Sequence, residues 1–391
     1  MSAAHLAFLL GKLRVGGAER IVLDLCGELA ARGDRIDLLL VKGTGGLGDR
    51  VPDGVRVVEL GVAGSLAGMP SVLRRLPPRV AFGEGTPSML RSTSRLARYL
   101  RAEAPDALLA TLRGPCLMAI WARRDARSDA RVVVRLANHA TRQARDETGP
   151  FKRRYPEWIR RFYPDADRVV AVAQGMAEDL VANVGLAPET VEVIHNPIDA
   201  ERIASRAREA PERDWPRDDG LPVLVTAGRL EPQKDHRNLL RAFARLRERR
   251  DARLLVLGDG SLRQGLVAEA SELGLADRVS FPGRVDNPHA YFARAAAFVL
   301  SSVFEGFPNV LLEALACGCP VVSTDCPSGP SEILSRPELG ALVPPGDPDA
   351  LADAMLAVLD APPDPSVLRA HAATFDLKET ATRYRDVMLG C

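Results

Sequence analysis

Short apolar runs alternate with amphipathic stretches along almost the whole chain. The runs predict buried strands at residues 5–10, 36–41, 107–111, 132–136, 168–173, 191–194, 222–227, 253–257, 279–281, 297–300 and 320–323. Helices fit between them, the first at about residues 18–32, with Gly33 placed to end it. Apolar strands that alternate with helices are typical of a parallel sheet covered on both faces. The fold class is therefore predicted to be α/β.

The pattern restarts once. A polar stretch with three prolines, residues 204–222, precedes the restart and is expected to be a linker or a surface segment. We therefore expect two doubly wound, Rossmann-like units in tandem, with residues 1–199 in the first domain and 200–374 in the second. Ligands of such sheets bind beyond the carboxyl ends of the strands. The predicted site is thus a cleft between the two domains, formed by the loops that follow the strands.

Composition excludes several classes of protein. No apolar run reaches the ~18 residues of a membrane span, and the chain starts without the basic region of a signal peptide, so a first buried strand is expected there. The net charge of +1 argues against a general nucleic-acid binder. The six cysteines include no CxxC pair, which favours reduced, buried thiols in a cytoplasmic protein over disulfides or a zinc site.

The charge is uneven along the chain. Residues 1–199 contain 29 Lys and Arg against 23 Asp and Glu, whereas residues 200–391 contain 23 against 28. A basic first half favours an anionic partner, such as a membrane surface or a diphosphate-linked acceptor.

One stretch of the basic half, from Phe151 to Tyr163, combines basic residues with an aromatic stripe. Tyr155, Trp158, Ile159 and Phe162 recur with helical spacing. A basic helix with such a stripe can lie on an anionic membrane. The alternative is a helix that packs the same stripe against the sheet.

Two glutamates eight residues apart, Glu305 and Glu313, are the most informative residues. The first precedes a predicted helix, and the second lies inside it. Pro308 suits the first turn of that helix, because its missing N–H has no helical partner there in any case. Free N–H groups and the helix dipole make such a start an anion site. A sugar hydroxyl would suit Glu305 as a partner, and a ribose diol would suit Glu313.

Other loops after predicted strands could hold a phosphate. Gly16 and Gly17 let a backbone approach closely, although they do not form a GxGxxG fingerprint, and an ordinary tight turn is the alternative. Arg229 and Lys234 could hold a diphosphate with two cations, and a solvated basic loop is the alternative. Gly258 is a weaker signal of the same kind.

Two further residues follow strands. His139 comes after the strand at 132–136, which directs it toward the same cleft, and a purely structural role is the alternative. Val285 follows the strand at 279–281, and the backbone of its loop could frame a base.

Together these loops resemble the retaining nucleotide-sugar glycosyltransferases of family 4 (group 1), which have the GT-B fold. The resemblance covers nearly the whole length. It lies in six segments in the family's order: residues 16–20 (GGAER), 193–199 (VIHNPID), 228–234 (GRLEPQK), 258–261 (GDGS), 305–313 (EGFPNVLLE) and 328–333 (SGPSEI). The glutamate run and the Arg/Lys loop are specific to the family, whereas the glycine turns are not.

The resemblance implies roles for the matching residues. Glu313 would hold the ribose hydroxyls, and Glu305 would hold hydroxyls of the donor sugar. Arg229 and Lys234 would bind the diphosphate and stabilise it as it leaves. His139 matches a family histidine near the sugar. Further donor contacts would come from Gly16, Gly17, Gly258, Val285 and the backbone of Phe307, Pro308, Asn309 and Val310. A C-terminal helix within residues 375–391 would cross back to the first domain.

The implied activity is transfer, with retention, from a nucleotide-diphosphate sugar to a saccharide hydroxyl. A UDP-sugar is the default donor. The second domain would bind the donor, and the first would bind a lipid-linked or cell-envelope acceptor. We expect no cofactor and no essential metal, and a cytoplasmic enzyme with peripheral attachment at the inner face of the plasma membrane. The alternatives are a sugar-nucleotide epimerase of the same fold, a transferase acting on a small molecule, and a non-enzymatic binding protein.

Overall fold

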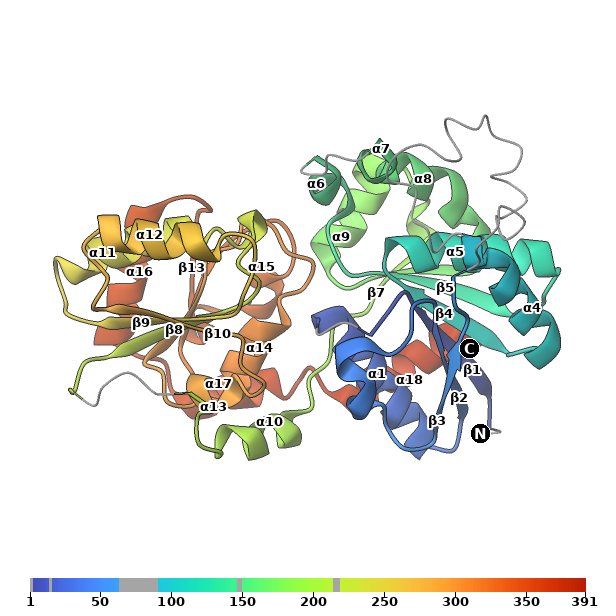
Figure 1. Ribbon diagram of the computed structural model, residues 1–391, viewed down its shortest axis with the longest axis horizontal. Helices are drawn as coiled ribbons and strands as arrows, with labels where there is room; N and C mark the ends of the chain where they lie inside the picture. Colours follow the sequence, from blue (N-terminus) through green and yellow to red (C-terminus); the bar gives the residue numbers. More distant parts are fainter. Residues whose placement is uncertain (1–2, 14–15, 63–90, 146–149, 214–218) are drawn as a thin grey trace. The chain divides into compact units, whose positions relative to one another are not determined.

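The computed structural model describes residues 3–13, 16–62, 91–145, 150–213 and 219–391 (Figure 1). The chain divides into two compact units, one made of Met1–Pro197 with Leu377–Cys391 and the other of Ile198–Asp376. Each unit contains one parallel sheet with helices around it. The predicted α/β fold class is confirmed.

The sheet of the first unit has seven parallel strands in the order β3-β2-β1-β4-β5-β6-β7. The strands are β1 (His5–Leu10), β2 (Arg35–Leu40), β3 (Val55–Glu59), β4 (Ala107–Thr111), β5 (Arg131–Leu136), β6 (Arg168–Ala171) and β7 (Val191–Val193). All but β3 lie within two residues of a predicted strand. The sequence analysis missed β3 because this edge strand is largely exposed and forms no continuous apolar run.

Helices cover both faces of this sheet. They are α1 (Gly17–Ala31), α4 (Thr93–Glu103), α5 (Arg113–Ala126), α6 (Ala140–Arg145), α7 (Pro150–Arg153), α8 (Tyr155–Phe162), α9 (Gln174–Asp179) and α18 (Leu377–Leu389). The units β1–α1–β2 and β4–α5–β5 run across the sheet in opposite directions. Because such crossovers are right-handed, α1 and α5 lie on opposite faces.

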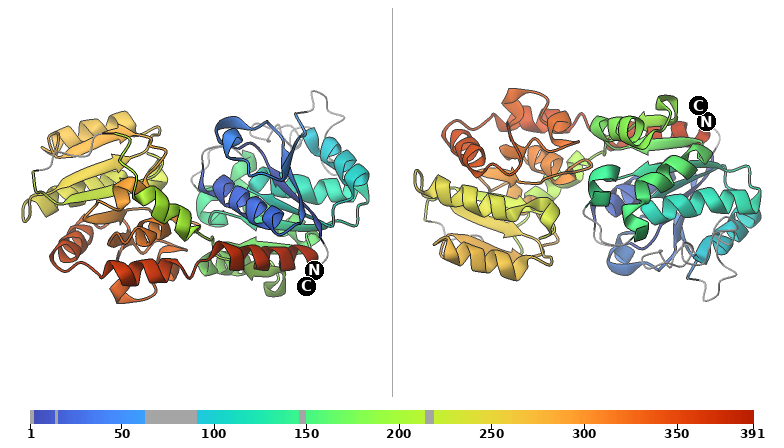
Figure 2. Two further views of the ribbon diagram at one scale, coloured as in Figure 1. Left: turned by 90° about the horizontal axis from the view of Figure 1, so that it is seen from below. Right: turned by 90° about the horizontal axis from the view of Figure 1, so that it is seen from above.

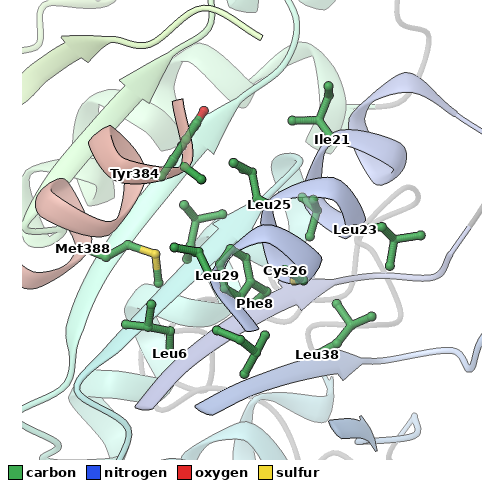
Figure 3. Packing of buried hydrophobic residues seen from close by; sticks show 14 of the residues in the cluster. Leu6, Phe8, Ile21, Leu23, Leu25, Cys26, Leu29, Leu38, Tyr384 and Met388 are labelled. Atoms are coloured by element: carbon green, nitrogen blue, oxygen red, sulfur yellow. The ribbon is translucent and has the colours of Figure 1, made fainter. Parts of the chain in front are cut away.

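The C-terminal helix α18 packs beside α1 on the first unit (Figure 2). The core between these helices and the sheet includes Leu6 and Phe8 of β1, Leu25 and Leu29 of α1, and Met388 of α18 (Figure 3). The same face of the sheet is thus closed by one helix from near the start of the chain and one from its end.

Polar contacts also hold α18 in place. Arg385 Nε donates to Asp34 Oδ2 over 2.8 Å. On β5, the fully buried guanidinium of Arg135 donates to Tyr384 Oη over 2.9 Å and to Asn196 Oδ1 over 2.5 Å. A buried arginine needs such partners, since an unpaired buried donor is costly. The end of the chain is therefore an integral part of the first unit.

The sheet of the second unit has six parallel strands in the order β10-β9-β8-β11-β12-β13. The strands are β8 (Val223–Ala227), β9 (Arg253–Leu257), β10 (Val279–Gly283), β11 (Ala297–Leu300), β12 (Val321–Thr324) and β13 (Ala341–Val343). The first five match predicted strands within two residues. The sequence analysis missed β13 because three residues are too few to give a pattern.

The helices of the second unit repeat the same arrangement. They are α10 (Ala200–Ala207), α11 (His236–Arg247), α12 (Arg263–Glu272), α13 (His289–Phe292), α14 (Asn309–Ala316), α15 (Pro330–Ile333), α16 (Pro348–Asp360) and α17 (Pro365–Ala372). The crossovers β8–α11–β9 and β11–α14–β12 run in opposite directions, so α11 and α14 lie on opposite faces. α16 packs against α11, and α17 packs against α14.

The polar stretch predicted at residues 204–222 is a surface segment of the second unit, and its described part does not act as a linker. It starts inside α10, where Arg206 Nη2 donates to Asp286 O over 2.8 Å. Farther along, the Glu212 carboxylate accepts hydrogen bonds from the backbone N–H groups of Asp286 and Asn287. Residues 214–218 lie outside the described part of the chain.

The aromatic stripe of the stretch from Phe151 to Tyr163 is packed inside the first unit. Tyr155, Ile159 and Phe162 of α8 are buried. Trp121 of α5 meets the rings of Trp158 and Phe162 edge-on, at centroid distances of 6.1 and 5.2 Å. The alternative in which the stripe packs inside the protein is therefore the one observed, because α5 occupies its apolar face. Contact of this stretch with a membrane stays a prediction. Among the described residues, no helix is long and apolar enough to cross a membrane.

Candidate functional site

The strand order of the second sheet reverses between β8 and β11, which are neighbours although β9 and β10 come between them in the chain. At such a point the loops after the two strands diverge and leave room beyond their carboxyl ends. The loop after β8 carries Arg229 and Lys234, and the loop after β11 carries Glu305. The topology of the sheet thus brings these predicted residues to one place.

Lys234 and Glu305 form a direct pair there. Lys234 Nζ lies 2.6 Å from Glu305 Oε1, although the two residues are 71 positions apart. The hydroxyl of Ser302 donates to the same carboxylate oxygen over 2.6 Å. The side chains of the pair are only 15% and 8% exposed, so their charge-assisted hydrogen bond is stronger than one in water. The result is a preorganised cation and carboxylate at the end of the sheet.

Further hydrogen bonds hold the two loops together. Gln233 Nε2 donates to Phe304 O over 2.9 Å, and Val303 N donates to Gln233 O over 2.9 Å. Ser301 Oγ donates to Lys234 O over 2.7 Å. These hydrogen bonds hold the backbones of the two loops together. The distance between Lys234 and Glu305 is therefore set by the backbone as well as by their long side chains.

The segment after β12 supports the Glu305 loop. Ser328 Oγ donates to Glu305 O over 2.8 Å. Gly329 has a φ of +94°, and a Cβ at this position would lie 2.6 Å from Pro308 Cδ and 2.9 Å from Gly306 O. Only glycine fits such a conformation and such a contact. Close packing against the Glu305 loop therefore accounts for Ser328 and Gly329 in the segment at residues 328–333.

Helix α14 begins directly after this loop. Pro308, predicted in the first turn, instead precedes the helix with a non-helical ψ of 87°, and Asn309 is the first helical residue. Phe307 is buried, with its ring centroid 5.7 Å from that of Phe375. Asn309 and Val310 are half-buried. The start of α14 thus carries backbone N–H groups close in sequence to Glu305, as predicted.

The neighbouring loops hold three other predicted residues. Arg229 is exposed, and its Nη2 lies 3.4 Å from Gln233 Oε1. Gly258 has a φ of +137°, and a Cβ there would lie 1.8 Å from Gly228 O, so packing between the loops after β8 and β9 by itself requires glycine. Val285 is buried in the loop after β10.

Glu313 lies in the second turn of α14 and is half-buried. Its Oε2 is 3.3 Å from Nε2 of His289, the first residue of α13. The His289 side chain is only 10% exposed. The sequence analysis did not identify His289, because it stands in no motif and reaches Glu313 only through the packing of α13 on α14.

One thiol and one imidazole near the Lys234–Glu305 pair are uncharged near pH 7. Burial, and then the charge of Glu305, raise the pKa of Cys326 to about 12, so its thiol stays protonated and unreactive. Burial, and then the charge of Lys234, lower the pKa of His236 to about 4, so its ring is neutral near pH 7. The six cysteines are free thiols. Burial was predicted for them, and it holds for Cys26, Cys116, Cys319 and Cys326 but not for the exposed Cys391.

In the first unit, Gly16 and Gly17 open α1, as predicted. Gly16 is the capping residue, with an extended backbone. A Cβ at Gly16 would lie 2.6 Å from Glu19 Oε2, so the glycine leaves room for this buried carboxylate. The two residues before Gly16 lie outside the described ranges.

His139, after β5, is buried beside an aspartate that the sequence analysis missed. His139 Nδ1 lies 3.1 Å from Asp179 Oδ2. Thr141 N and Oγ1 and Asn183 Nδ2 also donate to Asp179. Burial alone would raise the pKa of Asp179, but the neighbouring His139 ring and the hydrogen bonds from Thr141 and Asn183 outweigh it and lower this pKa to about 2. A carboxylate that is charged at neutral pH therefore lies beside Nδ1 of His139.

In the parts of the chain that the structure describes, no three His, Cys, Asp or Glu side chains gather as metal ligands do.

Two named relatives are similar to about half of this chain. The N-acetylgalactosamine-N,N'-diacetylbacillosaminyl-diphospho-undecaprenol 4-alpha-N-acetylgalactosaminyltransferase of Campylobacter jejuni is 41% identical over 181 residues, 46% of this chain and 47% of that protein. The lipopolysaccharide 1,6-galactosyltransferase of Escherichia coli K12 is 34% identical over 188 residues, 46% of this chain and 49% of that protein. The chain thus spans about half the length of the curated relatives it matches.

Solved structures and family descriptions extend the likeness to most of the chain. The crystal structure of Anabaena Alr3699/HepE in complex with UDP and glucose has a TM-score of 0.80 at 19% identity, covering 99% of this chain and 100% of that one, which shows the GT-B fold. Residues 15–202 match the family described as Glycosyltransferase Family 4, and residues 221–361 match Glycosyl transferases group 1. The chain therefore belongs to glycosyltransferase family 4, the group 1 glycosyltransferases.

Proposed function

We propose that this protein is a retaining glycosyltransferase that moves a sugar from a nucleotide-diphosphate sugar, UDP-sugar by preference, to a hydroxyl of a saccharide acceptor. The observation that carries the proposal is the Lys234–Glu305 pair at the strand-order reversal of the second sheet. A family 4 chain that keeps this charged pair largely buried and preorganised has the groups that sugar transfer requires.

The proposed roles follow from the charge that develops in the reaction. When the bond between the anomeric carbon and the diphosphate oxygen breaks, negative charge collects on the diphosphate. Lys234, the exposed Arg229 and the start of α14 would stabilise that charge. Lys234 gives one N–H to Glu305, which leaves two for phosphate oxygens. No bound cofactor takes part.

Glu305 would hold a hydroxyl of the donor sugar, and Glu313 the ribose. Glu305 receives hydrogen bonds from both Lys234 and Ser302, which makes it a poor nucleophile and favours a binding role. We infer that the acceptor hydroxyl attacks from the face that the diphosphate leaves, so the configuration is retained. Gly16, Gly17, Gly258, Val285 and the residues from Phe307 to Val310 would complete the donor site, and the first unit would bind the acceptor.

A lipid-linked or cell-envelope saccharide is the proposed acceptor. The names of the relatives from Campylobacter jejuni and Escherichia coli support it, since they refer to a diphospho-undecaprenol-linked sugar and to lipopolysaccharide. The solvent side of α7 and α8 supports peripheral contact with anionic lipid at the inner face of the membrane. Its exposed basic residues are Lys152, Arg153, Arg154, Arg160 and Arg161. Sedimentation with anionic but not neutral vesicles would test this contact.

The test of the activity is an assay of diphosphate release from UDP- and GDP-sugars, with and without saccharide acceptors. Release that depends on an acceptor, with a product of the donor's anomeric configuration, is the expected result. A donor isomerised without an acceptor would indicate an epimerase, and binding without turnover would indicate a non-enzymatic protein. Because Lys234 and Arg229 supply the positive charge, activity should change less than about twofold in EDTA, and a loss that Mg²⁺ restores would contradict this expectation.

The partner of His139 offers a second test. We expect Asp179→Asn to lower kcat about tenfold or more, because a neutral amide would replace the carboxylate beside Nδ1 of His139 and hold the ring of a catalytic-site histidine less firmly. Glu178→Gln, which changes the exposed neighbour on the same helix, is the matched control. Unchanged kcat in a folded Asp179→Asn variant would argue that His139 lies outside the reaction.

A further inference from the structure

The contact between His289 and Glu313 has no counterpart in the motifs, and it constrains a residue of the proposed donor site. Nε2 of His289 lies 3.3 Å from Oε2 of Glu313. An ionised carboxylate can only accept a hydrogen bond, so Nε2 is the nitrogen that carries the proton. The interaction therefore has a direction, from the imidazole of α13 to the carboxylate of α14.

The surroundings of His289 enclose its ring and backbone. The residue is buried, and its ring meets Phe292 edge-on at a centroid distance of 6.2 Å. Cys317, just after α14, has its sulfur 3.7 Å from the carbonyl oxygen of His289. On the other side of the ring, Nδ1 is buried and has no hydrogen-bond partner among the described residues. Among the described residues, the polar contact of the His289 side chain is therefore the one to Glu313.

We propose that His289 is a positioning residue that fixes the Glu313 carboxylate for two-point recognition of a ribose diol. This inference rests on the proposed function, in which Glu313 faces the ribose. A diol offers two O–H donors, and a carboxylate meets both only when its plane is held in the right orientation. A half-buried glutamate on a helix can rotate about three side-chain bonds, and the N–H of His289 restricts that rotation. The imidazole thus makes the site selective for ribonucleotides over deoxyribonucleotides.

The inference predicts a matched pair of variants. In His289→Gln the side-chain amide nitrogen reaches about as far as Nε2 and can still donate to Glu313. In His289→Asn the amide reaches only as far as Nδ1, so the donor is lost with little change in polarity. His289→Phe removes the donor and keeps a ring of similar size. If His289 had only a structural role, the preference for the ribonucleotide would vary with ring size and packing. If His289 positions Glu313, the preference depends on a hydrogen-bond donor at the place of Nε2.

The experiment measures the dissociation constants of the full-length protein for UDP and 2′,3′-dideoxy-UDP by calorimetry, and for the guanosine pair as well. We expect the parent to prefer the ribonucleotide by about tenfold or more, because the diol donates to a charged group. The preference should persist in His289→Gln and fall to about twofold or less in His289→Asn and His289→Phe. Glu313→Ala gives the reference value without the carboxylate, and melting curves check folding.

The possible results test the positioning role, the ribose preference and the proposed function separately. A full ribose preference in His289→Phe or His289→Asn overturns the positioning role, and so does a lost preference in a folded His289→Gln. If the parent binds both diphosphates equally, the inference fails while donor binding stands. If the parent binds no nucleoside diphosphate at all, the proposed function fails with it. Because Gln and Asn differ by one methylene, their comparison decides the question even when His289→Phe does not fold.

Discussion

Lys234→Ala is expected to lower kcat about 100- to 1000-fold, the loss typical of one preorganised electrostatic group that stabilises a developing anion. The ammonium group lies in a largely buried site, where a fixed charge acts more strongly than in water. Lys234→Arg keeps the charge and should retain more activity, although a guanidinium does not have the same geometry. The measurement is kcat for sugar transfer at saturating donor and acceptor.

The same substitution leaves the Glu305 carboxylate buried without its cation. We expect a loss of about 1–3 kcal/mol in the free energy of unfolding, which is the cost of an uncompensated buried polar group. Glu305→Gln in the Lys234→Ala background should recover stability but not activity. Comparing the single and double variants separates the electrostatic role in catalysis from the structural role of the pair.

Arg241→Ala is the matched control, because it removes an exposed cation of α11 that pairs with Glu269 in the same unit. It should leave kcat unchanged. If a folded Lys234→Ala enzyme kept more than half of the parent kcat, Lys234 would not stabilise the leaving diphosphate.

Asp37→Asn is expected to lower the free energy of unfolding of the first unit by about 3 kcal/mol at pH 7, because hydrogen bonds to a buried charge are lost. Asp37 on β2 is fully buried. Its carboxylate accepts hydrogen bonds from Arg56 Nε (2.7 Å), Tyr99 Oη (2.5 Å) and His5 Nε2 (2.8 Å). Arg56 stands directly opposite on β3, so the pair also fastens this edge strand.

The effect of Asp37→Asn should depend on pH in a defined sense. Burial alone would raise the pKa of Asp37, but the hydrogen bonds from Arg56, Tyr99 and His5 outweigh it and hold this pKa well below its usual range. A lowered pKa in the folded state means stability that is fully present above the unfolded pKa of about 3.9 and lost as pH falls below it. The difference between parent and variant should therefore shrink below about pH 4.

Urea unfolding followed by tryptophan fluorescence measures this difference. A Trp215→Phe background leaves Trp121 and Trp158, both in the first unit, as reporters. Asp353→Asn, which removes one partner of an exposed ion pair with Arg249, is the control and should change stability by less than about 1 kcal/mol. An Asp37→Asn variant as stable as the parent at pH 7 would show that Arg56 and Tyr99 find equally good partners elsewhere.

Local sequence patterns predicted most of the fold. Strands with nearly continuous apolar runs, such as β4 and β9, were predicted at their observed bounds, because a strand buried on both faces is apolar at most positions. The pattern failed for the edge strand β3 and for the three residues of β13. Edge position and length are properties of the finished sheet and leave little trace in local sequence.

The candidate site shows the same division. Glycines, cations and glutamates after apolar strands marked the loops, since ligands of parallel sheets bind at that end. No pattern along the chain indicated that Lys234 would donate to Glu305, or that His289 and Asp179 would lie beside Glu313 and His139. These pairings depend on which elements become neighbours.

The sequence by itself determined the alternation of buried strands and helices, the tandem repeat of that pattern, and the family, because these depend on residue type and spacing along the chain. Only the tertiary structure decided which loops meet, which carboxylate each basic side chain contacts, and where the aromatic stripe of α8 packs. An apolar stripe that faces a helix and one that faces lipid have the same sequence. What distinguishes them is the partner, here Trp121 of α5, which long-range packing supplies.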